Sequence, residues 1–247
     1  MDNNTIIRFE NVTKSYDDGT VVLKNINFEL ERGKFYTLLG PSGCGKTTLL
    51  NVIGLLDKPT SGSYFLNDQP VARLSSNRKA HLRAKKIGFV FQNFNLISSL
   101  NIIDNVSLPL LYSGYSKTRR AKKASQILKN FHLQKREYFF PYQLSGGQQQ
   151  RVAIARSLVN EPEIILADEP TGNLDSRSSH IVMEELRRIH SEGNTIIMVT
   201  HNPNLTTYAT RVINMLDGHI DTDIKTVSDR DLPQPVKVKF KKKKEKK

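Results

Sequence analysis

Short apolar runs recur along the chain, and glycine, aspartate or asparagine interrupts most of them. Runs rich in Val, Ile, Leu and aromatic residues predict buried or half-buried β-strands. We expect these strands at residues 6–9, 21–23, 25–30, 35–39, 63–66, 87–91, 163–167, 195–199 and 212–216, with a closing hairpin at 219–220. A turn signal at residues 17–19 joins the first strands, which therefore predict an antiparallel β layer.

Longer amphipathic stretches alternate with the later strands and predict α-helices. They cover residues 47–56, 75–86, 102–111, 117–131, 148–158 and 178–190. Between about residues 93 and 156 the pattern is mainly helical, which predicts a helical insert. The expected fold is α/β: a parallel core with an antiparallel β subdomain and an inserted helical subdomain.

A glycine-rich segment, Gly40-Pro-Ser-Gly-Cys-Gly-Lys-Thr-Thr48, follows one of these strands and precedes a helix. It matches the pattern G-x-x-x-x-G-K-[ST], in which glycines let backbone N–H groups turn toward phosphates at a helix start. Lys46 would reach the β- and γ-phosphates, and Thr47 would ligate Mg²⁺. A glycine-rich turn that happens to contain a lysine is the alternative. The residues expected to bind the nucleotide are Gly40, Pro41, Ser42, Gly43, Cys44, Gly45, Lys46, Thr47 and Thr48.

A second candidate anion site is the string Leu144-Ser-Gly-Gly-Gln148 at another expected helix start. The N–H groups of Ser145, Gly146, Gly147 and Gln148 would form a concave nest for an anion. An ordinary capped helix start would explain the serine but not two adjacent glycines. One nucleotide clamped between two copies of the protein would explain why a single chain carries two phosphate-binding helix ends.

Two carboxylates follow the apolar run at residues 163–167, at the end of an expected buried strand. Ligands bind at the strand ends of open α/β sheets. Asp168 would hold Mg²⁺, directly or through water, and Glu169 would orient and deprotonate an attacking water. A strand that simply ends in polar residues is the alternative.

Three further positions are weaker candidates. Gln92 follows a strand, where its amide would reach the metal or the attacking water. His201 follows another strand end, where it would contact the γ-phosphate, although a lone histidine is more often structural. Tyr16 precedes a turn and would stack on a base, although an isolated tyrosine is usually a packing residue.

The 247-residue chain has the composition of a globular protein, one cysteine and a net charge of +13. No apolar run approaches the ~20 residues of a membrane-spanning helix, and residues 1–5 do not resemble a secretory signal. We therefore expect a cytosolic chain. Residues 237–247 carry eight lysines and one glutamate, a net +7. A solvated, disordered tail over residues 231–247 is the favoured interpretation, with contact to anionic lipid or nucleic acid as alternatives.

Together these motifs resemble the ATP-binding subunit of an ATP-binding-cassette (ABC) transporter over residues 6–221. The resemblance implies a P-loop NTPase core of the RecA-like type and an ABC ATP-binding domain over residues 1–230, with its helical insert at about 93–156. It also implies an aromatic contact at Tyr16, a Walker A loop at 40–48, a Q-loop glutamine at Gln92 and a signature at 144–148. The Walker B pair Asp168 and Glu169, a D-loop at residues 173–175 and a switch histidine at His201 complete the set.

In that family two cassettes pair head to tail, which implies a homodimer that binds ATP and Mg²⁺. One copy would supply Lys46, Thr47 and Tyr16, and the other would supply Ser145 and Gly147. Glu169 would be the catalytic base, with His201 and Gln92 as further catalytic groups and Thr47, Gln92 and Asp168 around the metal. Dimer closure would drive an integral membrane permease through the Gln92 region. The chain would associate peripherally with the cytoplasmic face of the cell membrane, and no nucleic-acid partner is expected.

Several segments resemble the macrolide-export and lipoprotein-release branch: 53–62, 89–96, 105–110, 144–156 and 166–175. That branch implies export of antimicrobial peptides, antibiotics or lipoproteins. Residues 8–48 resemble instead the ATPases of polyamine importers. A signalling cassette of the cell-division branch and an ABC-type ATPase acting on DNA or ribosomes are further alternatives.

Overall fold

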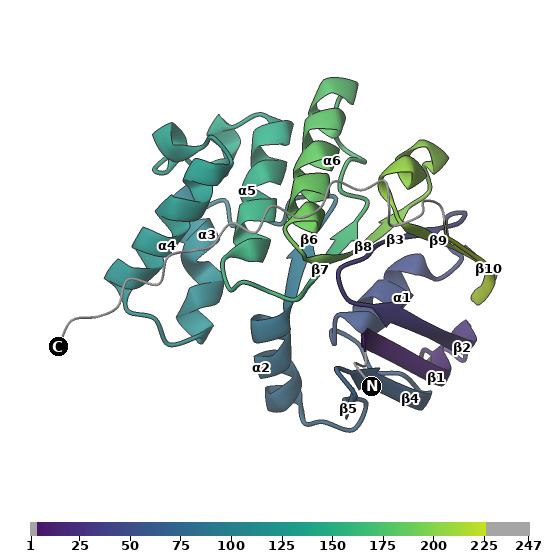
Figure 1. Cartoon of the computed structure of the whole chain (residues 1–247). Helices are drawn as coiled ribbons and strands as arrows, with labels where there is room; N and C mark the ends of the chain where they lie inside the picture. The colour runs from purple at the N-terminus through teal and green to yellow at the C-terminus, as the bar shows by residue number, and fades with distance from the viewer. Residues whose placement is uncertain (1–3, 226–247) are drawn as a thin grey trace.

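The computed structural model of the chain describes residues 4–225, and these residues form two β-sheets with helices around them (Figure 1). The four-stranded sheet has the order β2-β1-β4-β5 and the six-stranded sheet the order β10-β9-β3-β8-β7-β6. The predicted α/β fold is confirmed, with its antiparallel layer and its helical part. The basic tail predicted at residues 231–247 lies outside the described residues.

The antiparallel sheet is built on one long hairpin, β1 (Thr5–Ser15) and β2 (Val21–Glu31), flanked by β4 (Ser61–Leu66) and β5 (Gln69–Pro70). The expectation of separate strands at 21–23 and 25–30 is wrong, because β2 is continuous. Asn25 has a left-handed φ of 52° beside a shift in the β1–β2 register, so it forms a β-bulge rather than a turn. Asn11, also at φ 52°, lies at a second shift, and β1 continues past residue 9 to Ser15.

The six-stranded sheet has a parallel core of β6 (Ile87–Val90), β7 (Ile164–Asp168), β8 (Thr195–Thr200), β3 (Phe35–Leu39) and β9 (Arg211–Leu216), and β10 (His219–Lys225) is antiparallel to β9. Alternate residues of β3 face different hydrophobic clusters: Phe35 packs on the helical side and Tyr36 on the side of the antiparallel sheet. Because both faces are covered, the central strands are continuous apolar runs. Few strands could therefore be recognised by alternation alone.

The described part of the chain has six α-helices: α1 (Lys46–Ile53), α2 (Ser76–Lys86), α3 (Ile102–Tyr112), α4 (Lys117–Asn130), α5 (Gly146–Leu158) and α6 (Ser176–Ser191). Short 3₁₀ turns span Gln134–Arg136, Pro141–Gln143 and Pro203–Tyr208. Helix α1 ends earlier than predicted, because Gly54 caps it and Leu55 takes a left-handed φ of 58°. Helices α5 and α6 each begin two residues earlier than predicted.

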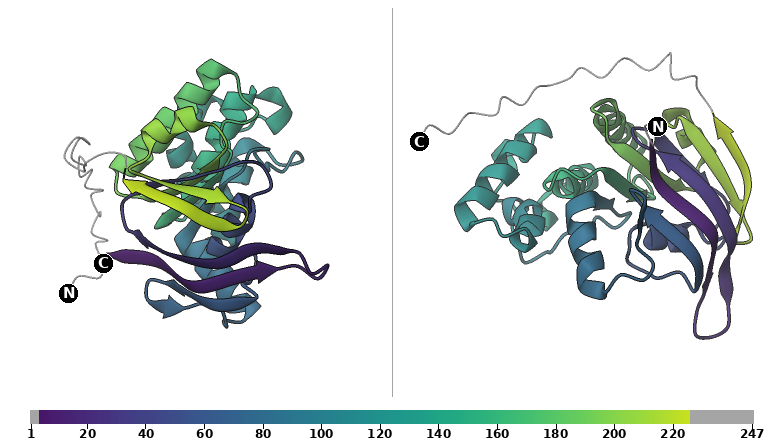
Figure 2. Two further views of the ribbon diagram at one scale, coloured as in Figure 1. Left: turned by 90° about the vertical axis from the view of Figure 1, so that its right-hand side faces the viewer. Right: turned by 60° about the horizontal axis from the view of Figure 1, so that its bottom comes forward.

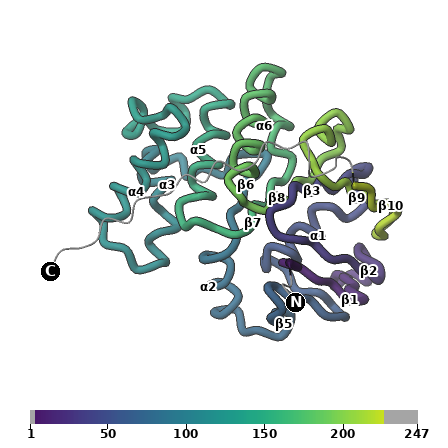
Figure 3. Tube along the Cα trace, viewed as in Figure 1, coloured from purple at the N-terminus to yellow at the C-terminus, as the bar shows by residue number. Residues whose placement is uncertain are grey.

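The chain runs from β6 out to α3 and α4 and returns through α5 to β7, as the trace in Figure 3 shows. In the right-hand view of Figure 2, α3 and α4 stand at the opposite end of the molecule from the antiparallel strands. Within residues 4–225, no helix combines the length and the apolar character needed to cross a membrane. This arrangement leaves the carboxyl ends of β3, β7 and β8 as the place where loop residues from distant parts of the chain meet.

Candidate nucleotide-binding site

Three neighbouring strand ends define the candidate site. The register pairs Leu39 of β3 with Thr200 of β8, and Asp168 of β7 with Val199 of β8. Because the strands are parallel, the segments that follow them leave the same edge of the sheet. The Gly40 loop, Glu169 and His201 are thereby brought together, although Gly40 and His201 are 161 residues apart in the chain.

The loop between β3 and α1 has the backbone geometry that a phosphate-binding turn requires. Gly43 and Gly45 have positive φ values of 82° and 101°, and Gly45 is the residue before α1. A Cβ on Gly45 would lie 3.0 Å from the Val22 carbonyl oxygen, and one on Gly40 only 2.4 Å from that of Met215. The loop is therefore held between the β2 and β9 segments in a shape that side chains would disrupt.

Lys46 lies inside this loop and is only 7% exposed. Its Nζ donates hydrogen bonds to the carbonyl oxygens of Gly40 (2.8 Å) and Pro41 (2.7 Å). The positive charge is thus fixed at the first turn of α1, where the helix dipole adds to it. A buried ammonium beside a glycine-rich helix start fits a polyphosphate group.

Cys44 takes a different role from its neighbours. Its side chain is buried, 4% exposed, and packs in the core with its Sγ near the Lys46 ammonium (3.9 Å). Only its backbone can therefore face a nucleotide, in contrast to Ser42 and Thr47, which are exposed. Thr48 is the third residue of α1, with its Oγ1 3.5 Å from the hydroxyl of Tyr16.

A hydroxyl and a carboxylate meet where α1 faces the end of β7. The Thr47 hydroxyl donates a hydrogen bond of 3.3 Å to Oδ1 of Asp168. Burial raises the pKa of Asp168, and the nearby negative charge of Glu169 raises it further, whereas the hydrogen bond from Thr47 lowers it. A cation here would relieve the cost of burying this carboxylate. Among residues 4–225 no cluster of three or more His, Cys, Asp or Glu side chains could hold a metal. The Thr47 hydroxyl and the Asp168 carboxylate are oxygen ligands of the kind that could hold Mg²⁺, which takes one or two protein oxygens together with phosphates and water.

Glu169 and His201 form the second pair at this edge. Glu169 Oε1 and His201 Nδ1 are 2.7 Å apart. The Glu169 backbone has a left-handed φ of 46° and is tied to β8 by its N–H, which donates to the Val199 carbonyl at 3.0 Å. A non-glycine residue in this region of φ is uncommon and often marks a functional site. The carboxylate is 18% exposed, so solvent can reach it.

Gln92 follows β6 and is bonded to the segment after Glu169. Its Nε2 donates to Oδ1 of Asn173 (3.3 Å), and Asn173 Nδ2 donates back to the Gln92 carbonyl (3.3 Å). A Cβ on Gly172 would lie 2.7 Å from the Gln92 amide nitrogen. In this structure Gln92 therefore contacts the segment at residues 172–173, and its expected contact with the metal stays a prediction.

The signature string forms the start of α5. Ser145 and Gln148 make a reciprocal capping box, in which the Ser145 N–H donates to Gln148 Oε1 (3.0 Å) and the Gln148 N–H to Ser145 Oγ (3.4 Å). A Cβ on Gly147 would lie 2.7 Å from Oγ of Ser178, and one on Gly146 would lie 3.3 Å from Leu174. Close packing of α5 against the start of α6 therefore explains one of the two glycines without any ligand.

The signature and the phosphate loop do not meet within one chain. Helix α1, which begins at the phosphate loop, lies on one side of β7 and β8 in Figure 1, and α5, which begins at the signature, lies on the other. The anion nest predicted at Ser145–Gln148 thus has no phosphate loop of its own chain opposite it.

Asp175 lies between the Walker B pair and α6. It caps that helix by accepting a hydrogen bond from the Ser178 N–H (2.9 Å).

Two polar residues of α5, Gln150 and the partly buried Arg156, were missed from the sequence. Gln150 is fully buried, and its Nε2 donates to the carbonyl oxygens of Pro170 (2.7 Å) and Phe91 (3.3 Å). Arg156 binds the carbonyl oxygens of residues 94 and 95, and burial lowers its pKa. Both tie α5 to the segment that carries Gln92, and Gln150 also ties it to the segment that carries Glu169. A glutamine on the apolar face of an amphipathic helix is the signal that would have revealed Gln150.

Comparisons with known proteins identify the family of this chain. The family model described as ABC transporter matches residues 23–172. An uncharacterized ABC transporter ATP-binding protein of Methanocaldococcus jannaschii is 49% identical over 87% of this chain and 97% of its own length. The macrolide export ATP-binding/permease protein MacB of Mannheimia succiniciproducens is also 49% identical, over 88% of this chain. The chain spans about a third of that relative, 34% of its length.

Solved structures show the same fold. The ATP-binding cassette MJ0796, solved as a dimer bound to ADP and phosphate, superposes with a TM-score of 0.83. Its sequence is 42% identical, and the match covers 90% of this chain and all of that one. The chain therefore belongs to the ABC transporter family, in which it is an ATP-binding cassette with MacB-like relatives.

Proposed function

We propose that this chain hydrolyses ATP at a site shared by two copies and thereby energises a membrane permease of the macrolide-export type. The observation that carries the proposal is the convergence of Lys46, the Thr47–Asp168 pair and the Glu169–His201 pair at the ends of β3, β7 and β8. This convergence places a phosphate-binding loop, oxygen ligands for a cation and a candidate base at the same edge of the six-stranded sheet.

Binding begins with the triphosphate. The α1 start and the Lys46 ammonium stabilise the β- and γ-phosphates, and Tyr16 stacks on the base. Thr47 and Asp168 would hold Mg²⁺, with Gln92 as the further ligand expected from its strand-end position. A cation held there would supply positive charge to the phosphate oxygens.

Hydrolysis uses the second pair. Glu169 accepts a proton from water as the water oxygen attacks the γ-phosphorus. The bond from that phosphorus to the oxygen bridging the β- and γ-phosphates breaks, and ADP and phosphate leave. His201 holds the carboxylate through its 2.7 Å contact, which fixes the direction from which the water approaches.

The second copy completes the site. In the proposed dimer Ser145, Gly146, Gly147 and Gln148 of one copy face the γ-phosphate held by the other. This is supported by the separation of α1 and α5 within the chain and by the dimeric form in which the similar cassette MJ0796 was solved. Binding energy from the second copy is then available only when ATP is present.

The permease is proposed to be a separate polypeptide on which the cassette sits at the cytoplasmic face of the membrane. The MacB relative is named as a joined ATP-binding and permease protein, whereas relatives in M. jannaschii and Bacillus subtilis are covered over 97% and 95% of their lengths by the cassette alone. Export of antibiotics, antimicrobial peptides or lipoproteins is the transport class that we propose.

Two measurements test this function. The purified chain should hydrolyse ATP in the presence of Mg²⁺, and a Lys46→Ala variant should not. Reconstitution with a permease of the macrolide-export type should change the ATPase rate when its cargo is added. A chain that neither hydrolyses ATP nor responds to such a permease would contradict the proposal.

A further inference from the structure

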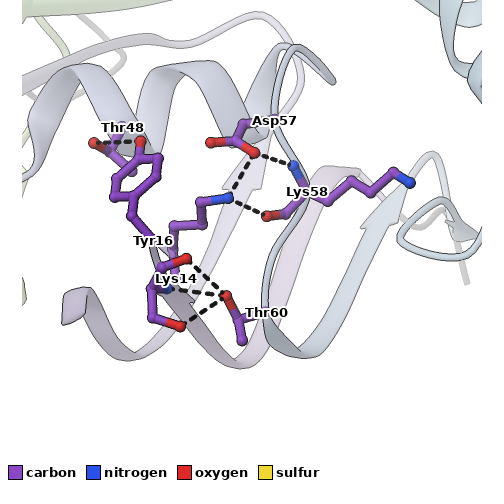
Figure 4. Close-up of polar contacts among 7 residues, drawn as sticks. Lys14, Tyr16, Thr48, Asp57, Lys58 and Thr60 are labelled. Atoms are coloured by element: carbon purple, nitrogen blue, oxygen red, sulfur yellow. Dashed lines mark hydrogen bonds and ion pairs between the residues drawn. The ribbon is translucent and has the colours of Figure 1, made fainter. Parts of the chain in front are cut away.

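Lys14, near the end of β1, is a buried lysine that none of the motifs above includes. It is 9% exposed. Its Nζ donates hydrogen bonds to Oδ1 of Asp57 (2.6 Å) and to the carbonyl oxygen of Lys58 (3.1 Å), and it lies 4.8 Å from the centre of the Tyr16 ring (Figure 4). The three donors of one ammonium therefore meet a carboxylate, a carbonyl and an aromatic face. Such complete pairing is what allows a lysine to be buried.

The acidic partner belongs to the segment that follows the phosphate-loop helix. Asp57 is anchored to the last turn of α1, because its N–H donates to the Asn51 carbonyl at 3.2 Å. Burial raises its pKa, but hydrogen bonds from the Lys14 ammonium and the Lys58 N–H outweigh burial and leave that pKa lowered. Asp57 is therefore a stable anion that connects Lys14 to α1.

The same segment grips β1 on both sides of Lys14. The Thr60 N–H donates to the Thr13 carbonyl (2.8 Å), and the Ser15 N–H donates to Oγ1 of Thr60 (2.9 Å). Figure 4 shows Thr60 beside β1 and Asp57 above Lys14. The end of β1 cannot shift relative to α1 without breaking these bonds.

Tyr16 is the residue that this arrangement positions. A tight turn fixes its backbone, since its N–H donates to the Thr20 carbonyl (3.1 Å) and its own carbonyl accepts from Gly19 (3.0 Å). Its ring is 43% exposed, and its hydroxyl lies 3.5 Å from Oγ1 of Thr48. Lys14 therefore packs against the ring and connects it, through Asp57, to the segment that follows α1. At the start of α1, the Tyr16 hydroxyl contacts Thr48.

We propose that Lys14 is a positioning residue for the base of the nucleotide: together with Asp57 it holds the Tyr16 ring at a fixed place relative to the phosphate loop. Lys14 does not touch the nucleotide, because its donors are already occupied. The inference rests on the proposed function, in which Tyr16 receives the base. It implies that loss of Lys14 weakens binding of ATP but not of a triphosphate without a base.

The test compares two ligands by calorimetry, ATP and inorganic tripolyphosphate, both with Mg²⁺. Lys14→Met should weaken ATP binding by about 3- to 30-fold, from the loss of one ion pair and one cation–π contact. Tripolyphosphate binding and kcat should change by less than about twofold, so the KM for ATP rises alone. Lys14→Arg should restore most of the affinity, and Asp57→Asn should act in the same direction as Lys14→Met. Lys58→Met is the matched control, because its side chain points away from Lys14 (Figure 4).

The possible outcomes distinguish failure of the positioning role of Lys14 from failure of the proposed role of Tyr16. If Tyr16→Ala leaves ATP binding as strong as before relative to tripolyphosphate, the assignment of the base to Tyr16 fails. If Tyr16→Ala weakens ATP selectively and both Lys14→Met and Asp57→Asn do not, the positioning role is overturned. An equal loss for both ligands, or no difference from Lys58→Met, would also overturn it. Thermal unfolding of each variant shows whether it folds. A general loss of stability would weaken binding of ATP and tripolyphosphate alike, so it cannot produce the selective loss of ATP binding.

Discussion

Replacing Glu169 by glutamine is the most informative single change at the site. The amide has nearly the same size as the carboxylate but cannot accept the proton of an attacking water. The residue has a partner at 2.7 Å in His201 and is 18% exposed, so little packing is lost. Loss of a positioned general base slows turnover by about 10²- to 10⁴-fold, which corresponds to about 2.7–5.4 kcal/mol of activation free energy.

ATP binding should survive this change, because Lys46 and the Thr47–Asp168 pair provide the phosphate and metal contacts. The assay measures phosphate release under saturating ATP, the dissociation constant for ATP, and the mass of the protein by light scattering with and without ATP. Glu169→Gln should lose turnover, bind ATP within about threefold of wild type, and accumulate as an ATP-bound dimer. His201→Ala should also slow turnover, through a misplaced carboxylate.

A normal rate of hydrolysis by Glu169→Gln would refute the assignment of the base. Loss of ATP binding together with turnover would refute the separation of roles between Glu169 and the phosphate loop. Thermal unfolding provides the control, since a folded variant with intact binding isolates the chemical step.

Three further changes test other parts of the structure. Gln150→Leu leaves two buried carbonyls without their donor, so it should lower the free energy of unfolding by about 1–2 kcal/mol in urea titrations and reduce turnover; unchanged stability and turnover would contradict this. Gly147→Ala places a Cβ 2.7 Å from Ser178 Oγ and should cost about 1–3 kcal/mol even in the monomer; a monomer as stable as wild type would argue against the packing role. Burial raises the pKa of Glu163, but Lys86 and the other hydrogen-bond donors around it lower that pKa to about 2. Because the pKa in the folded state lies below that in the unfolded state, this stabilisation is complete above about pH 5 and is lost as the pH falls toward 2. Glu163→Gln should therefore lower the free energy of unfolding by about 1–2 kcal/mol at pH 7, after allowance for solvent screening, and by much less at pH 2.5. An equal cost at both pH values would contradict that assignment.

Much of the site was predictable because its motifs are local. The loop at residues 40–48, the pair Asp168 and Glu169, and His201 each follow an apolar run of about five residues. Strands that carry such runs are buried and parallel, so their ends meet at one edge. Proximity of these side chains therefore followed from the strand pattern, although the pairing of Glu169 with His201 did not.

The features that the sequence did not predict depend on contacts between distant segments. Lys14 and Asp57 are 43 residues apart, and nothing in the surrounding pattern of either residue marks it as a partner. The continuous strand β2 was predicted as two strands, at residues 21–23 and 25–30. The β-bulge at Asn25 lies at this break, and it depends on the pairing with β1, which the sequence does not reveal. The close packing of Gly147 on α6, where an added Cβ would lie 2.7 Å from Oγ of Ser178, is another such contact; its role in an anion nest stays a prediction.

The sharing of ATP by two copies is tested most directly by a disulfide cross-link. One copy carries an affinity tag and Ser42→Cys in the phosphate loop, and the other carries Ser145→Cys in the signature, both in a background of Cys44→Ala and Glu169→Gln. Both engineered positions are exposed in the single chain. On oxidation with saturating ATP and Mg²⁺, we expect a disulfide-linked pair that joins a tagged to an untagged chain, and little of it with ADP. An ATP-bound dimer that gives no such cross-link would contradict the shared site. So would a control chain carrying both cysteines that forms the disulfide within itself.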